Sequence, residues 1–291
     1  MTDRYSQVST VLARVLVANL AVAVAKIALG YYSGTVSIIS DGFHSLTDSA
    51  SNVVGLVGVS IARRPPDANH PYGHRKYETM ASIGIMVFLI VVLVQVLSTA
   101  IDRLVHGGTP RIFPAGIALM TVTLIVNLFV VSYESRQGRR LKSEVLLADA
   151  KHTRSDVMTS IAVLGALFGV WLGYPLFDPV AALLVAGFIG HACWSIAQEA
   201  SRILSDEMMM DEGHVREVVQ SVAGVLGCEK IRTRGSADYV FLDLHLWLDR
   251  NMPLFTAHET SHVVKDRLMA TFPQLMDVVI HIEPPPATGS S

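Results

Sequence analysis

Charged residues are scarce in this sequence: Asp, Glu, Lys and Arg make up only 16% of the 291 residues. Soluble globular proteins usually carry about 25%, whereas 51% of this chain is hydrophobic. The deficit of charge indicates a protein with a large surface that faces lipid. The net charge of −2 argues against a nucleic-acid partner, because binding to phosphate requires a basic face.

Cysteine is also rare, and the two in the chain, Cys193 and Cys228, lie far apart. They offer neither a disulfide framework nor a zinc knuckle, so we expect both to pack in the interior. We expect no cleavable signal peptide, because the polar N-terminus MTDRYSQVST is not followed by a small-residue cleavage site. The first apolar segment should therefore remain as a membrane anchor.

Long apolar runs are what the sequence has in abundance. Six of them are long enough to cross a bilayer, which takes roughly 20 residues. They lie at Val11–Tyr32, Val36–Ala62, Thr79–Ile101, Ile112–Tyr133, Val145–Leu172 and Pro179–Ala197. The third and fourth are almost uniformly apolar, whereas the second and fifth carry several ionisable side chains. The sequence therefore predicts an all-α six-helix transmembrane bundle over residues 1–203.

The basic residues of the loops predict the orientation of the bundle, since cytoplasmic loops carry an excess of Lys and Arg. The loops after the second and fourth spans are basic: Arg63, Arg64, Arg75 and Lys76 in one, and Arg136, Arg139, Arg140 and Lys142 in the other. The three remaining loops hold only Arg103 and Arg111. We expect both termini to be cytoplasmic and the protein to be integral to a membrane of the bacterial inner (plasma) membrane type.

Residues 204–291 differ in composition and predict a small cytoplasmic α+β domain. Residues 238–249 alternate between leucines and polar side chains, the pattern of a half-buried strand. The expected elements are a helix, two strands, a helix and a strand, at Asp211–Ala223, Gly227–Arg234, Asp238–Asp249, Phe255–Phe272 and Asp277–Glu283. This order, αββαβ, is typical of a sheet packed against helices.

The second and fifth spans share the pattern D-x-x-H-x-x-x-D: Asp41, His44 and Asp48 in one, and Asp149, His152 and Asp156 in the other. These offsets place each set on one helix face, and ionisable residues inside a membrane are by default functional. Two imidazoles and two carboxylates suit tetrahedral Zn²⁺. The alternative to metal binding is that these residues make polar contacts between helices, above all the two outer aspartates, Asp41 and Asp149. Because the helices should be antiparallel, those aspartates cannot both join the HxxxD pairs at one site.

These motifs resemble the cation diffusion facilitator family of zinc transporters. The resemblance rests on SDGFHSLTD, on HTRSD, on the loop PPDANHPYGHRKYE, on six spans and on the αββαβ domain. It implies a homodimeric metal–proton antiporter that carries Zn²⁺, with a transport site made of His44, Asp48, His152 and Asp156. The first histidine resembles the zinc-preferring branch, although Fe²⁺, Cd²⁺ and Mn²⁺ remain open.

Two cytoplasmic groups could also bind metal. Asp67, His70 and His74 offer a carboxylate and two imidazoles, or else form an ordinary polar loop with a turn. The resemblance favours metal, because some family members bind zinc at matching positions. It likewise implies a regulatory zinc site in the last domain at His245, His258, His281 and Glu283, which otherwise are surface residues. Glu229 and Ile282 depart from the pattern of those relatives, so the site should be weaker or hold fewer ions.

Two other functions stay open at this point. His258-Glu-Thr-Ser-His262 matches HExxH, a zinc-peptidase motif in which Glu259 would be the general base. That interpretation leaves the intramembrane His/Asp pairs unexplained, and we therefore expect a transporter and no enzyme. A passive metal channel would use the same intramembrane residues. Proton-coupled, saturable transport would distinguish the antiporter from the channel.

Overall fold

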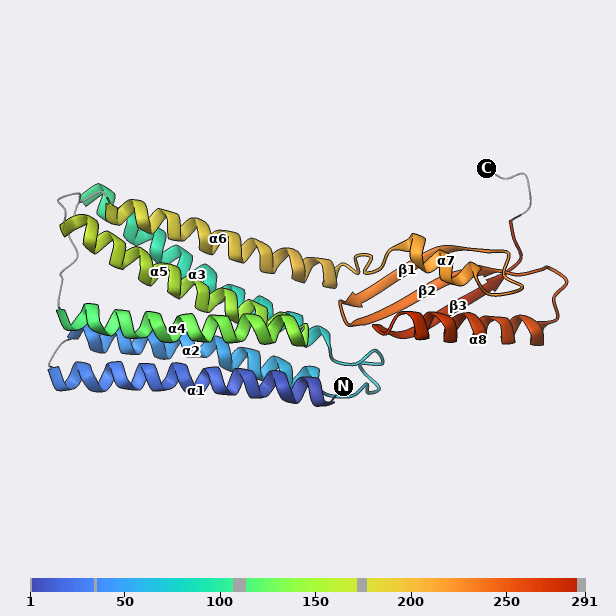
Figure 1. The fold of residues 1–291 in the computed structure, drawn as a ribbon, viewed down its shortest axis with the longest axis horizontal. Helices are drawn as coiled ribbons and strands as arrows, with labels where there is room; N and C mark the ends of the chain where they lie inside the picture. The colour runs from blue at the N-terminus through green and yellow to red at the C-terminus, as the bar shows by residue number, and fades with distance from the viewer. Residues whose placement is uncertain (1, 34–35, 107–113, 172–176, 287–291) are drawn as a thin grey trace. The chain divides into compact units, whose positions relative to one another are not determined.

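The computed structural model describes residues 2–33, 36–106, 114–171 and 177–286, with several side chains inside these ranges left undescribed, including those of 36–44, 47 and 48. The chain forms two compact units, Met1–Ala200 and Ser201–Ser291 (Figure 1). The predicted domain boundary was at residues 203 and 204. Each unit is described by itself.

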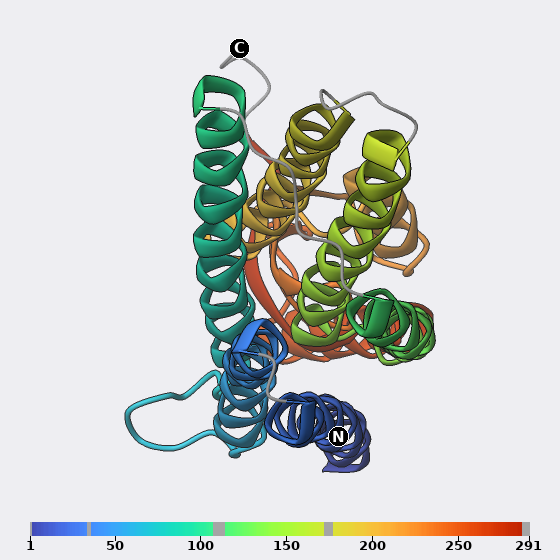
Figure 2. The ribbon, with the colours of Figure 1, turned by 90° about the vertical axis from the view of Figure 1, so that its left-hand side faces the viewer.

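Six long helices make up the first unit, as the apolar runs predicted. They are α1 (Thr2–Ser33), α2 (Val36–Ala62), α3 (Lys76–His106), α4 (Pro114–Leu141), α5 (Glu144–Trp171) and α6 (Phe177–Leu204), and they lie roughly alongside one another (Figure 2). Among the described residues, four stretches are long and apolar enough to span a membrane: Arg4–Ala28, Lys76–Asp102, Ile117–Leu141 and Val180–Leu204.

Several helices extend beyond the predicted apolar runs. Helix α1 begins at Thr2 instead of Val11, and α4 ends at Leu141 instead of Tyr133. The added turns are mostly polar in sequence, but one face of them packs against the bundle. In α1, for example, Tyr5 and Val8 of the added turns are buried. Apolar length alone therefore underestimated these helices, since a helix continues into water wherever one face still packs.

The core of the bundle is tightly packed near its basic loops. The most deeply buried side chains there come from four helices: Leu12, Val59, Ile85 and Leu146. Gly58 of α2 allows a close approach to α3, because a Cβ at this position would lie 2.3 Å from the Cβ of Ala81. A side chain at Gly58 would force the two helices apart.

The second unit has the predicted αββαβ order. Its elements are α7 (Glu212–Gln220), β1 (Gly227–Ser236), β2 (Tyr239–Trp247), α8 (Leu254–Thr271) and β3 (Leu275–Glu283). The sheet order is β1-β2-β3, with β1 antiparallel and β3 parallel to β2. All five predicted elements begin or end one to three residues away from the observed bounds, as happens at frayed ends.

Four alternating leucines, three in β2 and Leu248 directly after it, lie at the core of the second unit. Leu242, Leu244, Leu246 and Leu248 are at most 2% exposed. They share one hydrophobic cluster with Val219 of α7, Val264 and Leu268 of α8, and Cys228 of β1. Both cysteines are buried and unpaired with each other, as expected. The side chains between the leucines point to the opposite face of the sheet, and that face carries three of the four candidate metal ligands of this unit.

Candidate metal-transport site

The fifth helix positions half of the predicted transport site. His152 is only 3% exposed, and neither of its ring nitrogens has a hydrogen-bond partner among the residues that the structure describes. Buried polar atoms in proteins are nearly always paired, so an imidazole in this state is available to bind an ion. His152 and Asp156, which lies one helical turn further along α5, both line one cavity.

This cavity has a volume of about 300 Å³ and is lined by polar side chains from five helices. Its polar lining comprises Asn19, Lys26, Ser45, Gln95, Thr123, Asn127, His152, Thr153, Asp156, Thr159 and Ser160. Ser45 belongs to α2 and directly follows His44. The side chains of His44 and Asp48, the other half of the predicted site, lie outside the described residues, as does that of Asp41.

The cavity opens among the helix halves that lie away from the basic loops. Its lining starts at Asn19 in α1 and at Val92 in α3, each well over ten residues beyond the helix start. The halves nearer the basic loops hold the packed core described above. In the described parts of α1, α2, α3 and α5, the buried core residues thus lie nearer the basic loops, and the cavity lies at and beyond His152.

Asp149 holds α5 against α2. Its carboxylate is fully buried and accepts hydrogen bonds from the Ser51 hydroxyl at 3.1 Å and from the Asn52 amide. Asn52 in turn accepts a hydrogen bond of 2.9 Å from Asn19 of α1. The sequence left the role of Asp149 open between ligand and helix contact, and these bonds favour the helix contact.

Glu134 is a residue of this region that the sequence interpretation missed. It lies in α4, is 0% exposed, and accepts a hydrogen bond of 3.1 Å from the Thr153 hydroxyl. Its Oε1 has no partner among the described residues. The signal in the sequence was an ionisable residue directly after the apolar run Ile112–Tyr133.

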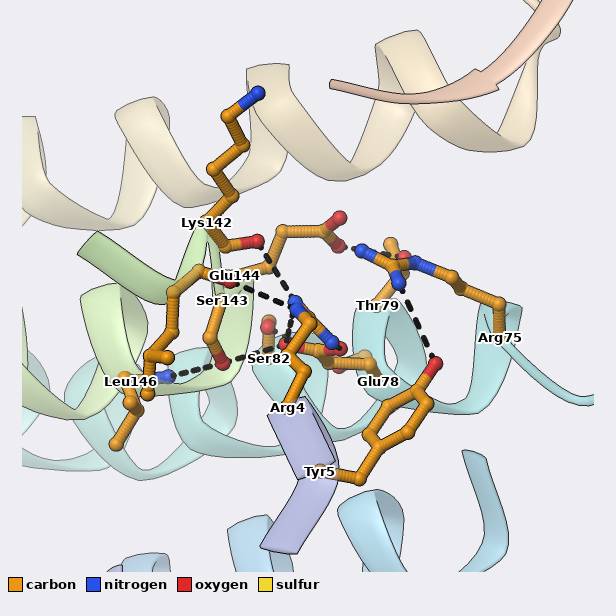
Figure 3. Close-up of polar contacts among 11 residues, drawn as sticks. Arg4, Tyr5, Arg75, Glu78, Thr79, Ser82, Lys142, Ser143, Glu144 and Leu146 are labelled. Atoms are coloured by element: carbon orange, nitrogen blue, oxygen red, sulfur yellow. Dashed lines mark hydrogen bonds and ion pairs between the residues drawn. The ribbon is translucent and has the colours of Figure 1, made fainter. Parts of the chain in front are cut away.

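A cluster of polar contacts that the sequence did not reveal joins the helix ends next to the basic loops (Figure 3). Arg4 of α1 pairs with the Glu78 carboxylate of α3 at 3.0 and 3.3 Å. The same guanidinium donates to the carbonyl oxygens of Leu141 at 2.7 Å and Lys142 at 2.8 Å. The Ser143 hydroxyl donates to Glu78 Oε1 at 2.5 Å. We call these five residues the Arg4 cluster; it connects α1, α3 and the turn between α4 and α5.

Comparison with known proteins identifies the family. Residues 12–205 match the model of the cation efflux transmembrane domain, and residues 209–285 match that of the cation efflux protein cytoplasmic domain. The chain belongs to the cation efflux family. It is thus a cation efflux transporter for divalent metals, integral to the membrane, with a cytoplasmic C-terminal domain and no enzymatic activity.

Individual relatives cover most of the chain. A cation-efflux pump, FieF, of Serratia proteamaculans is 32% identical over 89% of this chain and 87% of its own length. Metal tolerance protein C1 of Arabidopsis thaliana is 28% identical over 92% of this chain and 61% of its own. The metal-bound C-terminal domain of the CzcD transporter from Thermotoga maritima is 21% identical, with a TM-score of 0.24 over 26% of this chain and 94% of its own.

The HETSH segment of this transporter lies on α8 and is not catalytic. His258, Glu259 and His262 are exposed on the helix surface, and the two imidazole rings lie 4.5 Å apart. Because the chain belongs to a family of transporters, a chance match of three residues accounts for the HExxH pattern.

The loop between α2 and α3 brings together the three predicted ligands of its site. The ligand atoms of Asp67, His70 and His74 lie within 4.8 Å of one another. Asp67 Oδ1 is 3.1 Å from His70 Nδ1, and Asp67 Oδ2 is 3.4 Å from His74 Nε2. A hydrogen bond from the His70 backbone lowers the pKa of Asp67, so this carboxylate stays ionised. Metal binding here remains a prediction, and the geometry is compatible with it.

In the cytoplasmic domain, three of the four predicted ligands come together. His245 and His281 are register partners on β2 and β3, and their ligand atoms lie within 4.8 Å of one another and of Glu283. Glu283 Oε2 is 3.1 Å from His245 Nδ1 and 3.8 Å from His281 Nε2. His258, the fourth, is on α8 and is not in this group, which we call the β2–β3 cluster.

The charge of Glu283 favours cation binding at the β2–β3 cluster. Partial burial raises the pKa of this carboxyl group, but hydrogen bonds from His245 and from the Trp247 indole outweigh it, and the net pKa is lowered. The indole N–H donates to Glu283 Oε1 at 3.2 Å, which leaves Oε2 directed at the two histidines. A carboxylate with a lowered pKa remains a ligand under mildly acidic conditions.

We expect zinc to stabilise the full-length transporter partly through the β2–β3 cluster. A ligand at about 100 times its dissociation constant adds roughly 2.7 kcal/mol to the free energy of unfolding. The double variant His245→Ala, His281→Ala should lose much of the zinc-dependent rise in Tm, measured in detergent. His262→Ala is the matched control, because it removes an exposed histidine of the same domain. Equal zinc responses in the double variant and the wild type would contradict the prediction.

Proposed function

We propose that this transporter exports Zn²⁺ from the cytoplasm in exchange for protons, by alternating access of a site made of His44, Asp48, His152 and Asp156. The observation that carries the proposal is the buried His152, with both ring nitrogens unpaired among the described residues, beside Asp156 in one polar cavity. Imidazole and carboxylate together form the ligand set that Zn²⁺ prefers. The shared HxxxD pattern of α2 supplies the other two ligands.

Proton exchange follows from the chemistry of these ligands. Zinc binds imidazole and carboxylate in their deprotonated forms, so protons and metal compete for the same lone pairs. Metal loaded from the cytoplasm would be displaced by protons on the other side. The cavity lies at and beyond His152, and the side towards the basic loops is packed, which is the arrangement expected of an outward-open state.

The wider assembly is also part of the proposal. The match to the cytoplasmic domain of cation efflux proteins supports a homodimer, and the basic loops support cytoplasmic termini in a bacterial-type plasma membrane. The loop group Asp67, His70 and His74 and the β2–β3 cluster are proposed as cytoplasmic metal sites. The latter would sense metal and favour transport when cytoplasmic zinc is high, since binding stabilises the assembled site.

Metal uptake into proteoliposomes tests the function. Full-length transporter whose cytoplasmic domain faces outward should accumulate Zn²⁺ when the lumen is acidic, and lumenal pH should rise as zinc enters. The rate should saturate with zinc concentration and fall strongly when the pH gradient is collapsed. A panel of Zn²⁺, Fe²⁺, Cd²⁺ and Mn²⁺ in the same vesicles determines selectivity. Zinc flux that neither saturates nor moves protons would instead show a passive channel.

A further inference from the structure

A network of hydrogen bonds beside the transport cavity involves four helices. Asn19 of α1 donates to Asn52 of α2 at 2.9 Å, and Asn52 donates to the carboxylate of Asp149 in α5. The hydroxyl of Thr153, also in α5, donates to Glu134 of α4 at 3.1 Å. Asn19 and Thr153 line the cavity, whereas the other three side chains are at most 1% exposed. The network therefore reaches from the cavity into the interior of the bundle.

Two buried carboxyl groups meet in this network. The Glu134 side chain lies within hydrogen-bonding reach of the Asp149 side chain. Ionised carboxylates can only accept hydrogen bonds, and two of them in contact inside a protein cannot both keep their charge. Glu134 Oε1 has no donor among the described residues. One proton between the two carboxyl groups provides the hydrogen bond and removes the repulsion.

The donors around the pair assign the proton to Glu134. Asp149 accepts hydrogen bonds from the Ser51 hydroxyl and from the Asn52 amide, and such bonds stabilise the ionised form of a carboxyl group. The donor that the structure describes for Glu134 is the Thr153 hydroxyl. That hydroxyl also lies 3.2 Å from the Asp149 carbonyl oxygen, and its single proton is shared between the two acceptors. Asp149 is therefore the carboxylate, and Glu134 is the carboxylic acid that donates to it.

The charges that act on Glu134 link it to the transport site. Those of Asp149 and Asp156, both on α5, are negative. On α1, which also packs against α4, Arg14 is exposed and donates to the Tyr133 hydroxyl at 3.2 Å. Negative surroundings hold a proton on Glu134 while the transport site is empty. Zn²⁺ at Asp156 would cancel the negative charge there and so favour loss of that proton.

We propose that Glu134, paired with Asp149, binds one of the protons that the transporter exchanges for zinc. This inference rests on the proposed function and adds to it a proton-binding group that is not a metal ligand. When zinc binds, the Glu134 carboxyl group becomes a carboxylate, and its proton passes to the water of the cavity by way of the Thr153 hydroxyl. Protons on the ligands compete with zinc for lone pairs, whereas this proton competes with zinc through charge alone.

Titration calorimetry of the full-length transporter with Zn²⁺, in buffers of different ionisation enthalpy, counts the protons released per zinc. The titrations use a background with His70→Ala, His245→Ala and His281→Ala, so that the cytoplasmic sites do not contribute. In this background, which serves as the reference, Glu134→Gln should release about one proton fewer, and the logarithm of its Kd should change by about one unit less per pH unit. Glu78→Gln is the matched control, since Glu78 is an equally buried glutamate that the Arg4 cluster keeps ionised.

Infrared difference spectroscopy detects the proton directly in the wild type. Addition of Zn²⁺ should remove the C=O stretching band of a protonated carboxyl group, and that band should shift in D₂O. The same band should be absent from Glu134→Gln before zinc is added and present in Glu78→Gln. This measurement reports on a bound proton and does not depend on transport activity.

Three results would overturn the inference. The first is a wild-type spectrum in which zinc removes no protonated carboxyl band, a result that holds even if Glu134→Gln fails to fold. The second is equal proton release by the reference protein and by folded Glu134→Gln, which leaves proton exchange at the metal ligands intact and rejects Glu134 alone. The third is zinc binding by the reference protein without any proton release, which rejects the proposed exchange as well.

Discussion

Asp156→Asn should lower zinc flux at least about 100-fold, since even groups that merely support a metal ligand change affinity by 10- to 100-fold. Asparagine has nearly the same volume and can still form hydrogen bonds in the cavity. It lacks the negative charge and the basic lone pairs with which a carboxylate binds Zn²⁺. The expected loss is therefore one of metal binding and not of folding. Zinc flux in proteoliposomes and Tm in detergent measure the two separately.

Ser160→Ala is the matched control for this variant. Ser160 is also on α5 and lines the same cavity as Asp156, but it is not a predicted ligand. We expect its zinc flux to stay within about twofold of wild type, as for a substitution that removes no ligand. His152→Ala should behave like Asp156→Asn. If Asp156→Asn transports zinc at the wild-type rate while folded, the assignment of the transport site is wrong.

The elements that could be predicted from the sequence are those whose signal is local. Apolar length revealed the six membrane helices, and strict alternation revealed β2 with its buried Leu242, Leu244 and Leu246. The HxxxD spacing placed His152 and Asp156 on one face of α5, and the structure places both at one cavity. Each of these patterns extends over fewer than 30 residues, so the chain itself carries the information.

The interactions that could not be predicted join residues far apart in the chain. Arg4 and Glu78 are separated by 74 positions, and Asn52 and Asp149 by 97. No periodicity relates such partners, because they meet only when the helices pack. His258 was predicted as a ligand from the family resemblance. It lies on α8 and does not join the β2–β3 cluster, whose described members are His245, His281 and Glu283.

Glu78→Gln should lower the free energy of unfolding by about 3 kcal/mol, because removing one partner of a buried ion pair leaves the other charge uncompensated. The Glu78 side chain is 2% exposed and that of Arg4 is 16% exposed, so solvent screens this pair weakly. The Ser143 hydroxyl also donates to Glu78 and would lose its charged acceptor. The Arg4 cluster connects three parts of the bundle at its packed end (Figure 3), and we expect that end to loosen first.

Thermal unfolding in detergent measures this effect, with Glu207→Gln as the control. Glu207 pairs with Arg202 at the same distance of 3.0 Å, but both of those side chains are about half exposed, and such pairs contribute only about 0–1 kcal/mol. Glu78→Gln should therefore lower Tm by several degrees and Glu207→Gln by almost none. Arg4→Gln and the double variant Arg4→Gln, Glu78→Gln complete a double-mutant cycle, in which a coupling of at least about 1 kcal/mol is expected for contacting charges. Additive effects in that cycle would mean that Arg4 and Glu78 stabilise the bundle independently, and that the Arg4 cluster does not act as a unit.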